Sequence, residues 1–309
     1  MCYLTPNYKP ICEQSPPLRR EGHTNMTTAT EPDEEKGITA VTSTDGTEIA
    51  YERSGTGPPL VMVHGSWLSR GTWNPMLPQL AESLRVITYD RRGHGKSDRP
   101  SGQGSVQEDV ADLAALIENL EIGPAWVFGQ SFGGSITLRL AGERPDLLRG
   151  IVAHEPPLFS LVADDPDVGP MLEGFGQMSA EVVDKIAAGD HAGAAEQFIE
   201  EGLGSGVWDR LSPETRQMII EHAPTYLDEA NDPEQLAFDL EWISGFPHPA
   251  LLTQGDQSPP VFPPVVTKLA EALPSAEVRK FTGAGHIIQE DQPEDYAEAI
   301  VAFIQQNEK

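Results

Sequence analysis

The chain has 309 residues, of which 39% are apolar, and a chain of this length can bury the core of one large α/β domain. It carries 21 Lys and Arg against 48 Asp and Glu, a formal net charge of −27, and a field of that sign repels phosphate backbones and anionic lipid surfaces. The charge balance therefore excludes nucleic-acid binding and disfavours a membrane partner.

The negative charge is not confined to a tail, because residues 1–37 contribute only a small part of it. Only 7 of the 21 cationic side chains are Lys, so the folded surface is expected to be acidic and poor in lysine. Such a surface suits a cytoplasm of high salt, where self-repulsion is screened, but it is also found on ordinary acidic enzymes. Both interpretations stay open.

Cysteine usage and hydropathy limit the cellular setting. Both cysteines, Cys2 and Cys12, lie in the polar N-terminal stretch, so neither a disulfide framework nor a cysteine metal site is expected in the domain. No apolar run approaches the ~20 residues of a membrane span, and no secretory signal pattern is present. We expect a soluble, cytoplasmic protein.

Residues 1–37 form a polar, proline-containing stretch without apolar periodicity, which predicts a disordered tail. Met26 lies within it and is an alternative start. From Ile38 the pattern changes to a hairpin, residues 38–44 and 48–53 around Asp45-Gly46. Short apolar runs that alternate with helical stretches then predict a mostly parallel sheet covered on both faces, with strands at residues 60–63, 86–89, 125–128, 150–153, 250–253 and 277–281.

The alternation stops between about Pro156 and Pro249, where helix-start signals appear instead, at Ser212-Pro213-Glu214 and Asp232-Pro233-Glu234. We interpret residues 156–248 as an inserted helical cap between two parts of one core, residues 38–155 and 249–309. Among the large cap residues, Trp208 and Trp242 are candidates for a substrate pocket, together with Trp67 of the core.

Chemistry is indicated first by Gly129-Gln130-Ser131-Phe132-Gly133, which follows a predicted strand and opens a helix. A GxSxG pattern in this context places the serine on a sharp turn, with its hydroxyl exposed at the carboxyl end of the sheet. The glycines two positions before and after Ser131 allow strand and helix to approach closely. Ser131 is therefore the candidate nucleophile.

Two further loops follow predicted strands. In His64-Gly65-Ser66-Trp67, the amide of Ser66 is a candidate oxyanion donor together with the amide of Phe132 at the start of the helix, and His64 is expected to fix the loop. The loop Asp90 to Ser97 is rich in glycine but lacks the spacing of a phosphate-binding loop. We interpret that loop as a structural turn.

With these elements in this order the sequence resembles the α/β-hydrolase superfamily from about Ile38 to the C-terminus. The resemblance implies a doubly wound sheet with an inserted cap, and a catalytic histidine in the loop after the last strand. Gly283-Ala284-Gly285-His286 occupies that place, so His286 is the implied base.

The acid departs from the commonest family pattern, because Ser258 stands where most members carry Asp after the penultimate strand, and Asp256 lies two residues earlier. Haloalkane dehalogenases and zearalenone lactone hydrolases carry the acid after the strand that follows the nucleophile helix, and His154-Glu155-Pro156-Pro157 resembles the latter group. We favour Glu155, with Asp256 as the alternative and Asp291 as a third possibility. Dehalogenase chemistry is disfavoured because that subfamily uses a carboxylate nucleophile and this chain has Ser131.

The expected reaction is hydrolysis of a small apolar ester or lactone through an acyl-enzyme, with neither metal nor organic cofactor. A carbon–carbon bond hydrolase or a perhydrolase on the same site remains an alternative. So does a hormone-receptor-like binding protein with slow turnover. The oligomeric state is not predicted.

Overall fold

The computed structural model describes residues 37–308, so the predicted tail up to residue 36, with both cysteines and Met26, lies outside the described residues. Eight strands form one sheet in the order β1-β2-β4-β3-β5-β6-β7-β8. The first three in this order pair antiparallel and the other pairs are parallel. The strands are β1 Thr39–Thr42, β2 Glu48–Ser54, β3 Pro59–Val63, β4 Arg85–Tyr89, β5 Ala125–Gln130, β6 Leu148–His154, β7 Ala250–Gly255 and β8 Ala276–Phe281.

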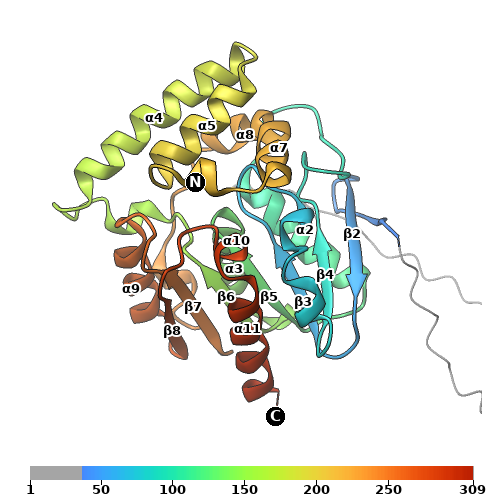
Figure 1. The fold of residues 1–309 in the computed structure, drawn as a ribbon. Helices are drawn as coiled ribbons and strands as arrows, with labels where there is room; N and C mark the ends of the chain where they lie inside the picture. The colour runs from blue at the N-terminus through green and yellow to red at the C-terminus, as the bar shows by residue number, and fades with distance from the viewer. Residues whose placement is uncertain (1–36, 309) are drawn as a thin grey trace, which may run out of the picture. The chain divides into compact units, whose positions relative to one another are not determined.

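Helices cover both faces of this sheet (Figure 1). One face packs against α2 (Val106–Asn119), α3 (Phe132–Glu143) and α9 (Phe262–Ala272), and the other against α1 (Leu77–Leu80) and α11 (Pro293–Asn307). Alternate residues of the central strands supply the two apolar layers, so that Val61 and Val127 face one layer while Met62 and Phe128 face the other. The predicted fold class, a doubly wound and mostly parallel sheet, is confirmed.

Between β6 and β7 the chain is helical, and Figure 1 shows α4, α5, α7 and α8 together at one end of the sheet. This segment contains α4 (Gly169–Ala187), α5 (His191–Gly202), α6 (Val207–Arg210), α7 (Pro213–His222) and α8 (Tyr226–Ala230), with 3₁₀ turns at Phe159–Val162, Ala223–Thr225 and Leu240–Trp242. The remaining short elements are α10 (Ile288–Asp291) and 3₁₀ turns at Arg70–Trp73 and Pro145–Leu147. No helix of residues 37–308 is long and apolar enough to cross a bilayer.

The two helix starts expected between β6 and β7 differ in outcome. Ser212 caps α7 by accepting a hydrogen bond from the Thr215 amide, as predicted. Asp232 opens only a turn, because its carboxylate is shared between the Glu234 amide and the amide of Val106, the first residue of α2. The prediction of a helix at Asp232 is wrong because this carboxylate serves the N-terminus of a different helix.

A buried ion-pair cluster connects α8 to α2 and to the loop after β4. Arg91, which follows β4, donates to Asp109 of α2 at 2.7 Å and to Glu229 of α8 at 2.9 Å. All three side chains are almost fully buried, and the Arg91 guanidinium also lies 4.5 Å from the centre of the Phe132 ring. Because a buried charge is costly without its partners, this cluster ties α8 to the loop after β4.

Candidate active site

Ser131 lies on the sharp turn that the sequence predicts, between β5 and α3. Its backbone has φ 54° and ψ −123°, a conformation rare for a residue with a side chain. The turn depends on two glycines, since a Cβ atom at Gly129 would lie 2.1 Å from the Gly133 carbonyl oxygen and one at Gly133 would lie 2.2 Å from the Val63 oxygen. The Ser131 side chain does not cap α3, which leaves its hydroxyl available for chemistry.

The loop after β3 is held beside this turn by His64. The His64 Nδ1 lies 2.9 Å from the Gly65 carbonyl oxygen, and Nε2 accepts a hydrogen bond from the Arg91 amide at 3.0 Å. Burial, assisted by the charge of Arg91, places the pKa of His64 well below its usual range. His64 is therefore neutral and fixes the loop that carries Ser66, as the sequence predicts.

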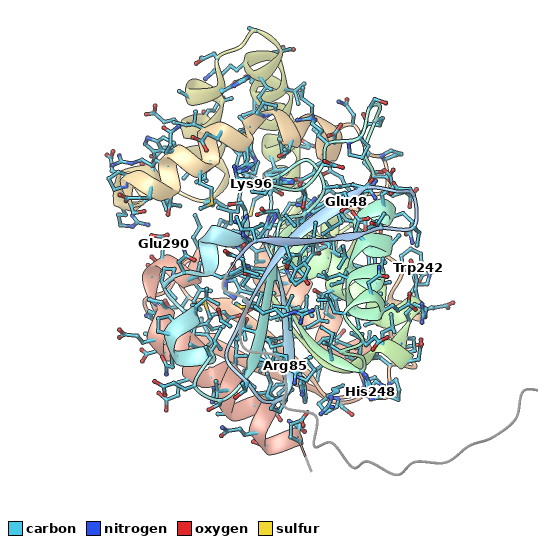
Figure 2. The ribbon with its side chains drawn as sticks, turned by 90° about the vertical axis from the view of Figure 1, so that its right-hand side faces the viewer. Glu48, Arg85, Lys96, Trp242, His248 and Glu290 are labelled. Atoms are coloured by element: carbon cyan, nitrogen blue, oxygen red, sulfur yellow. The ribbon has the colours of Figure 1, made fainter. Side chains whose placement is uncertain are left out.

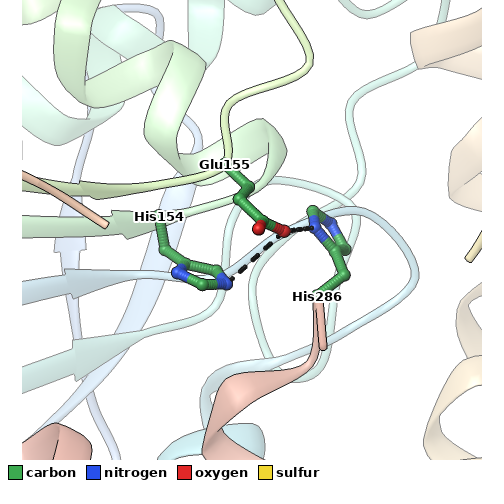
Figure 3. A group of neighbouring side chains, drawn as sticks. All are labelled: His154, Glu155 and His286. Atoms are coloured by element: carbon green, nitrogen blue, oxygen red, sulfur yellow. Dashed lines mark hydrogen bonds and ion pairs between the residues drawn. The ribbon is translucent and has the colours of Figure 1, made fainter. Parts of the chain in front are cut away.

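Glu155 and His286 form a buried pair, with 2.8 Å between Glu155 Oε2 and His286 Nδ1 (Figure 3). The other carboxylate oxygen, Oε1, accepts a hydrogen bond from the Gly255 amide at 2.8 Å. Glu155 follows β6 directly, with φ at 44°, and its side chain is inaccessible to solvent. The structure thus brings together Glu155 and His286, which are 131 positions apart in the sequence.

The pKa of Glu155 is lowered, although burial alone would raise it. The opposing influences come from His154, from the hydrogen bond with His286 and from the Ser258 hydroxyl. Burial also lowers the pKa of His154 to about 4, so His154 carries no charge near neutral pH and the hydrogen bond with His286 becomes the main stabilising contact. Glu155 is therefore ionised near neutral pH and presents a negative charge to His286.

Two contacts hold His286 that no local sequence pattern indicates. The Phe262 ring stacks on the imidazole, with 4.4 Å between ring centres and 14° between ring planes. The Gln130 side chain donates to the His286 carbonyl oxygen at 3.0 Å. Gln130 precedes Ser131 directly, so one short segment carries Ser131 and also fixes the backbone of His286.

The two alternative acids bind the backbone of the histidine loop. Asp256 accepts a hydrogen bond from the Gly283 amide at 2.7 Å, and Asp291 accepts one from the Gly285 amide at 2.7 Å. The hydrogen bond from the Gln257 side chain and, after it, the one from the Gly283 amide lower the pKa of Asp256. The carboxylate in hydrogen-bond contact with the His286 ring is that of Glu155.

A cavity lies beside Ser131 and His286, with a volume of about 800 Å³ when the open solvent at its mouth is included. Ser131, His286, Ser66 and Phe132 all line it. The rest of the wall is mostly apolar and comes from both the core and the segment between β6 and β7, including Trp67, Phe159, Phe175, Phe198, Leu203, Ile219, Tyr226, Leu236, Val261 and Phe262. This arrangement can hold an apolar molecule against the Ser131 hydroxyl.

A family model for the alpha/beta hydrolase fold matches residues 58–293, most of the chain. The chain belongs to the α/β-hydrolase family. This α/β-hydrolase is 31% identical over 284 residues to a non-heme chloroperoxidase of Streptomyces lividans, a match that covers 85% of the chain and 98% of the relative. The family resemblance predicted from the sequence is confirmed.

Two solved structures give the same fold at about a quarter identity. A thermophilic esterase from Thermogutta terrifontis matches with a TM-score of 0.72 and 25% identity, over 88% of this chain and 100% of the other. Est816, described as an N-acyl homoserine lactone degrading enzyme, matches with a TM-score of 0.68 and 25% identity, over 86% of this chain and 100% of the other. The α/β-hydrolase is thus similar to hydrolytic enzymes over nearly all of its described residues.

Of the three predicted pocket tryptophans, the structure places Trp67 in the cavity wall and the other two elsewhere. Trp242 is 47% exposed and packs on Phe238 and beside Gly142 of α3, and Figure 2 shows it on the outside of the molecule. Trp208 lies on α6 and packs against an apolar cluster that includes the cavity-wall residues Trp67 and Ile219. Neither Trp208 nor Trp242 is among the residues that line this cavity, and Trp242 packs on α3 instead.

Among the described residues, His154, Glu155 and His286 form a group with three potential metal-ligand atoms within 4.8 Å of one another. The Glu155 oxygens are already engaged by the His286 ring and the Gly255 amide. A carboxylate that accepts from an imidazole is also the arrangement that orients a histidine for proton transfer. That no metal is bound here, as expected from the sequence, stays a prediction.

Proposed function

We propose that this α/β-hydrolase is a serine hydrolase that cleaves a carboxylic ester or lactone, with Ser131, His286 and Glu155 as its catalytic residues. The observation that carries the proposal is the hydrogen bond between Glu155 and Nδ1 of His286, since His286 lines the same cavity as Ser131. Because Nδ1 is held by the carboxylate, Nε2 is the nitrogen that serves the serine.

The mechanism follows from these positions. His286 removes the proton of the Ser131 hydroxyl while its oxygen attacks the substrate carbonyl carbon, and Glu155 stabilises the imidazolium that forms. The imidazolium then protonates the leaving alcohol oxygen. In the second half, His286 deprotonates a water molecule as it attacks the acyl-enzyme, and then returns that proton to the Ser131 oxygen as the bond to the acyl group breaks and the acid leaves.

We assign to the backbone amides of Phe132 and Ser66 the stabilisation of the negatively charged oxygen in the tetrahedral intermediate. Phe132 is the first residue of α3, where the helix dipole favours negative charge, and Ser66 lines the same cavity. A well-aimed donor of this kind contributes about 3–4 kcal/mol to transition-state stabilisation.

The cavity wall supports an apolar substrate of some length. A second hollow, lined by Met171, Leu172, Met178, Pro259 and Pro260, shares Phe159, Phe175, Gly202 and Val261 with the catalytic cavity. The two hollows are therefore neighbours, and the second is lined by α4 and by the residues directly before α9. An ester with an extended apolar chain fits this shape better than a compact polar one.

The similarity to an esterase and to a lactone-degrading enzyme also supports this substrate class. The test is a panel of esters, lactones and thioesters with acyl chains of increasing length, assayed with the wild type and with Ser131→Ala. We expect the wild type to hydrolyse apolar esters or lactones and Ser131→Ala to lose this activity. Activity that survives in Ser131→Ala refutes the proposal.

A second candidate, perhydrolysis, is favoured by the 31% identity to a chloroperoxidase over 98% of its length. In that reaction hydrogen peroxide replaces water in the attack on the acyl-enzyme, and a peracid is released. The two functions are separated by the partition of one acyl donor between acid and peracid at increasing peroxide concentration. If the only product is the carboxylic acid at every peroxide concentration, the enzyme carries out hydrolysis and not perhydrolysis.

A further inference from the structure

His154 is a buried histidine beside the catalytic pair for which the mechanism above has no use. It is the last residue of β6, directly before Glu155, and its side chain is inaccessible to solvent. Its Nε2 lies 3.6 Å from Glu155 Oε2, the oxygen that also contacts His286 (Figure 3). The Glu155 carboxylate thus lies between two imidazole rings.

The other nitrogen of His154 begins a chain of hydroxyl groups. Nδ1 lies 2.9 Å from Thr253 Oγ1 on β7, and that oxygen lies 2.8 Å from the Tyr296 hydroxyl on α11. Thr253 and Tyr296 are both fully buried. Two hydroxyls and one imidazole therefore form a buried relay that ends at His154 Nε2, a buried nitrogen without a hydrogen-bond partner among the described residues, 3.6 Å from Glu155 Oε2.

The hydrogen bonds of this relay can be donated in two directions along the chain of groups. Only one of them is compatible with a carboxylate beside His154 Nε2. If Tyr296 donates to Thr253 and Thr253 donates to His154 Nδ1, then His154 Nε2 carries hydrogen and points a donor at Glu155. In the opposite direction Nε2 would present a lone pair to a negative charge, which is repulsive. The other acceptor for the Thr253 proton, the Ala153 carbonyl oxygen, lies farther away at 3.5 Å.

The His154 imidazole acts as a neutral hydrogen-bond donor and not as a cation. Besides Glu155, the groups that face it are the ring of His286, the Tyr296 ring at 5.6 Å and the backbone carbonyls of Gly285 and His286. Burial outweighs all of them and lowers the pKa of His154 to about 4. A neutral imidazole can orient the carboxylate without cancelling the charge that His286 needs.

We propose that His154 is a positioning residue that holds the Glu155 carboxylate through an Nε2–H donor, with its tautomer set by Thr253 and Tyr296. The proposal rests on the proposed function, since it assigns His154 a part in the same reaction. By sharing Oε2, His154 makes the carboxylate less basic toward His286. It therefore moderates the basicity of His286 as well as the geometry of the pair.

The experiment compares His154→Phe, which keeps a planar ring without donors, with His154→Gln, whose amide can place an N–H near the position of Nε2. In His154→Phe we expect kcat to fall on the order of tenfold with little change in KM, because the loss lies in the reacting geometry. The acid limb of the kcat/KM profile should move up by about half a pH unit, because a more basic Glu155 favours protonated His286. His154→Gln should return the limb close to the wild-type position.

Thr253→Val provides a second route if His154→Phe does not fold. It removes the hydroxyl that sets the His154 tautomer and should shift the limb in the same direction by less. Thr88→Val is the matched control, since Thr88 is a buried strand threonine on β4. All of these variants are assayed with a substrate whose hydrolysis Ser131→Ala abolishes.

Three outcomes are distinguishable. An acid limb that moves in His154→Phe or Thr253→Val but not in Thr88→Val, and that returns in His154→Gln, supports the proposal. An unchanged limb in the folded variants, with activity still dependent on Ser131, overturns the role of His154 alone. Activity that persists in Ser131→Ala overturns the proposed function instead.

Discussion

The substitution Glu155→Gln tests the assignment of the acid most directly. Glu155 is buried and contacts His286 Nδ1 at 2.8 Å, so the substitution removes a charge while it retains the volume of the side chain. Two unit charges about 4 Å apart interact by about 4 kcal/mol at the effective dielectric that suits protein sites. That interaction alone is worth about a thousandfold in rate.

A second effect adds to this loss. The glutamine amide can donate to Nδ1, which would place the imidazole hydrogen on Nε2, where the serine proton must go. Loss of the orienting carboxylate in serine hydrolases of this kind costs about 10⁴ in turnover, or roughly 5.5 kcal/mol. We expect a loss of that order for Glu155→Gln.

The matched control is Asp256→Asn. Asp256 accepts a hydrogen bond from the Gly283 amide, and an asparagine oxygen can accept the same bond. We therefore expect a loss below about tenfold. Single-turnover acylation with a p-nitrophenyl ester measures the step in which the imidazolium forms, and circular dichroism verifies that both variants fold. If Asp256→Asn loses more acylation rate than Glu155→Gln, the acid belongs after β7 and the assignment of Glu155 fails.

Three further predictions concern stability. The net charge of −27 should make the melting temperature rise with KCl, because counterions screen self-repulsion, and a flat melting temperature up to molar salt would contradict this. Below pH 6.5 the unfolded chain protonates His64, His94 and His154 while burial keeps them neutral in the fold, so stability should fall by up to about 1.4 kcal/mol per pH unit for each. Urea unfolding between pH 7.5 and 5.5 checks that sign, and a midpoint independent of pH would refute it. Arg91→Met should cost about 3–5 kcal/mol in urea unfolding, since Asp109 and Glu229 are left buried without their cation, whereas a loss below about 1 kcal/mol would show that the cluster is solvated.

Much of the sheet follows from local pattern. The hairpin around Asp45-Gly46 and the parallel strands were predictable because each is a short apolar run next to a turn or a helix, and the structure places strands at all of them. The turn at Ser131 was predictable for the same reason, since Gly129 and Gly133 are required within five residues of chain.

The remainder of the site depends on contacts that join distant segments. Nothing local to Phe262 indicates that it stacks on His286, and nothing local to Asp232 indicates that it caps α2. Trp242 illustrates the converse, since a large aromatic residue suggests a pocket wherever it occurs, and its position on the outside of α3 is set by tertiary packing.

The positions of the proposed catalytic groups along the chain have a consequence for biosynthesis. Ser131 and Glu155 both belong to one βαβ unit, β5-α3-β6, while His286 follows β8, the last strand to be made. On the proposed roles, a growing chain that has completed β6 already holds its nucleophile and its acid but has no base. The serine therefore stays unreactive toward esters until β8 has paired with β7, so the onset of hydrolysis during synthesis would report that the last strand is in place.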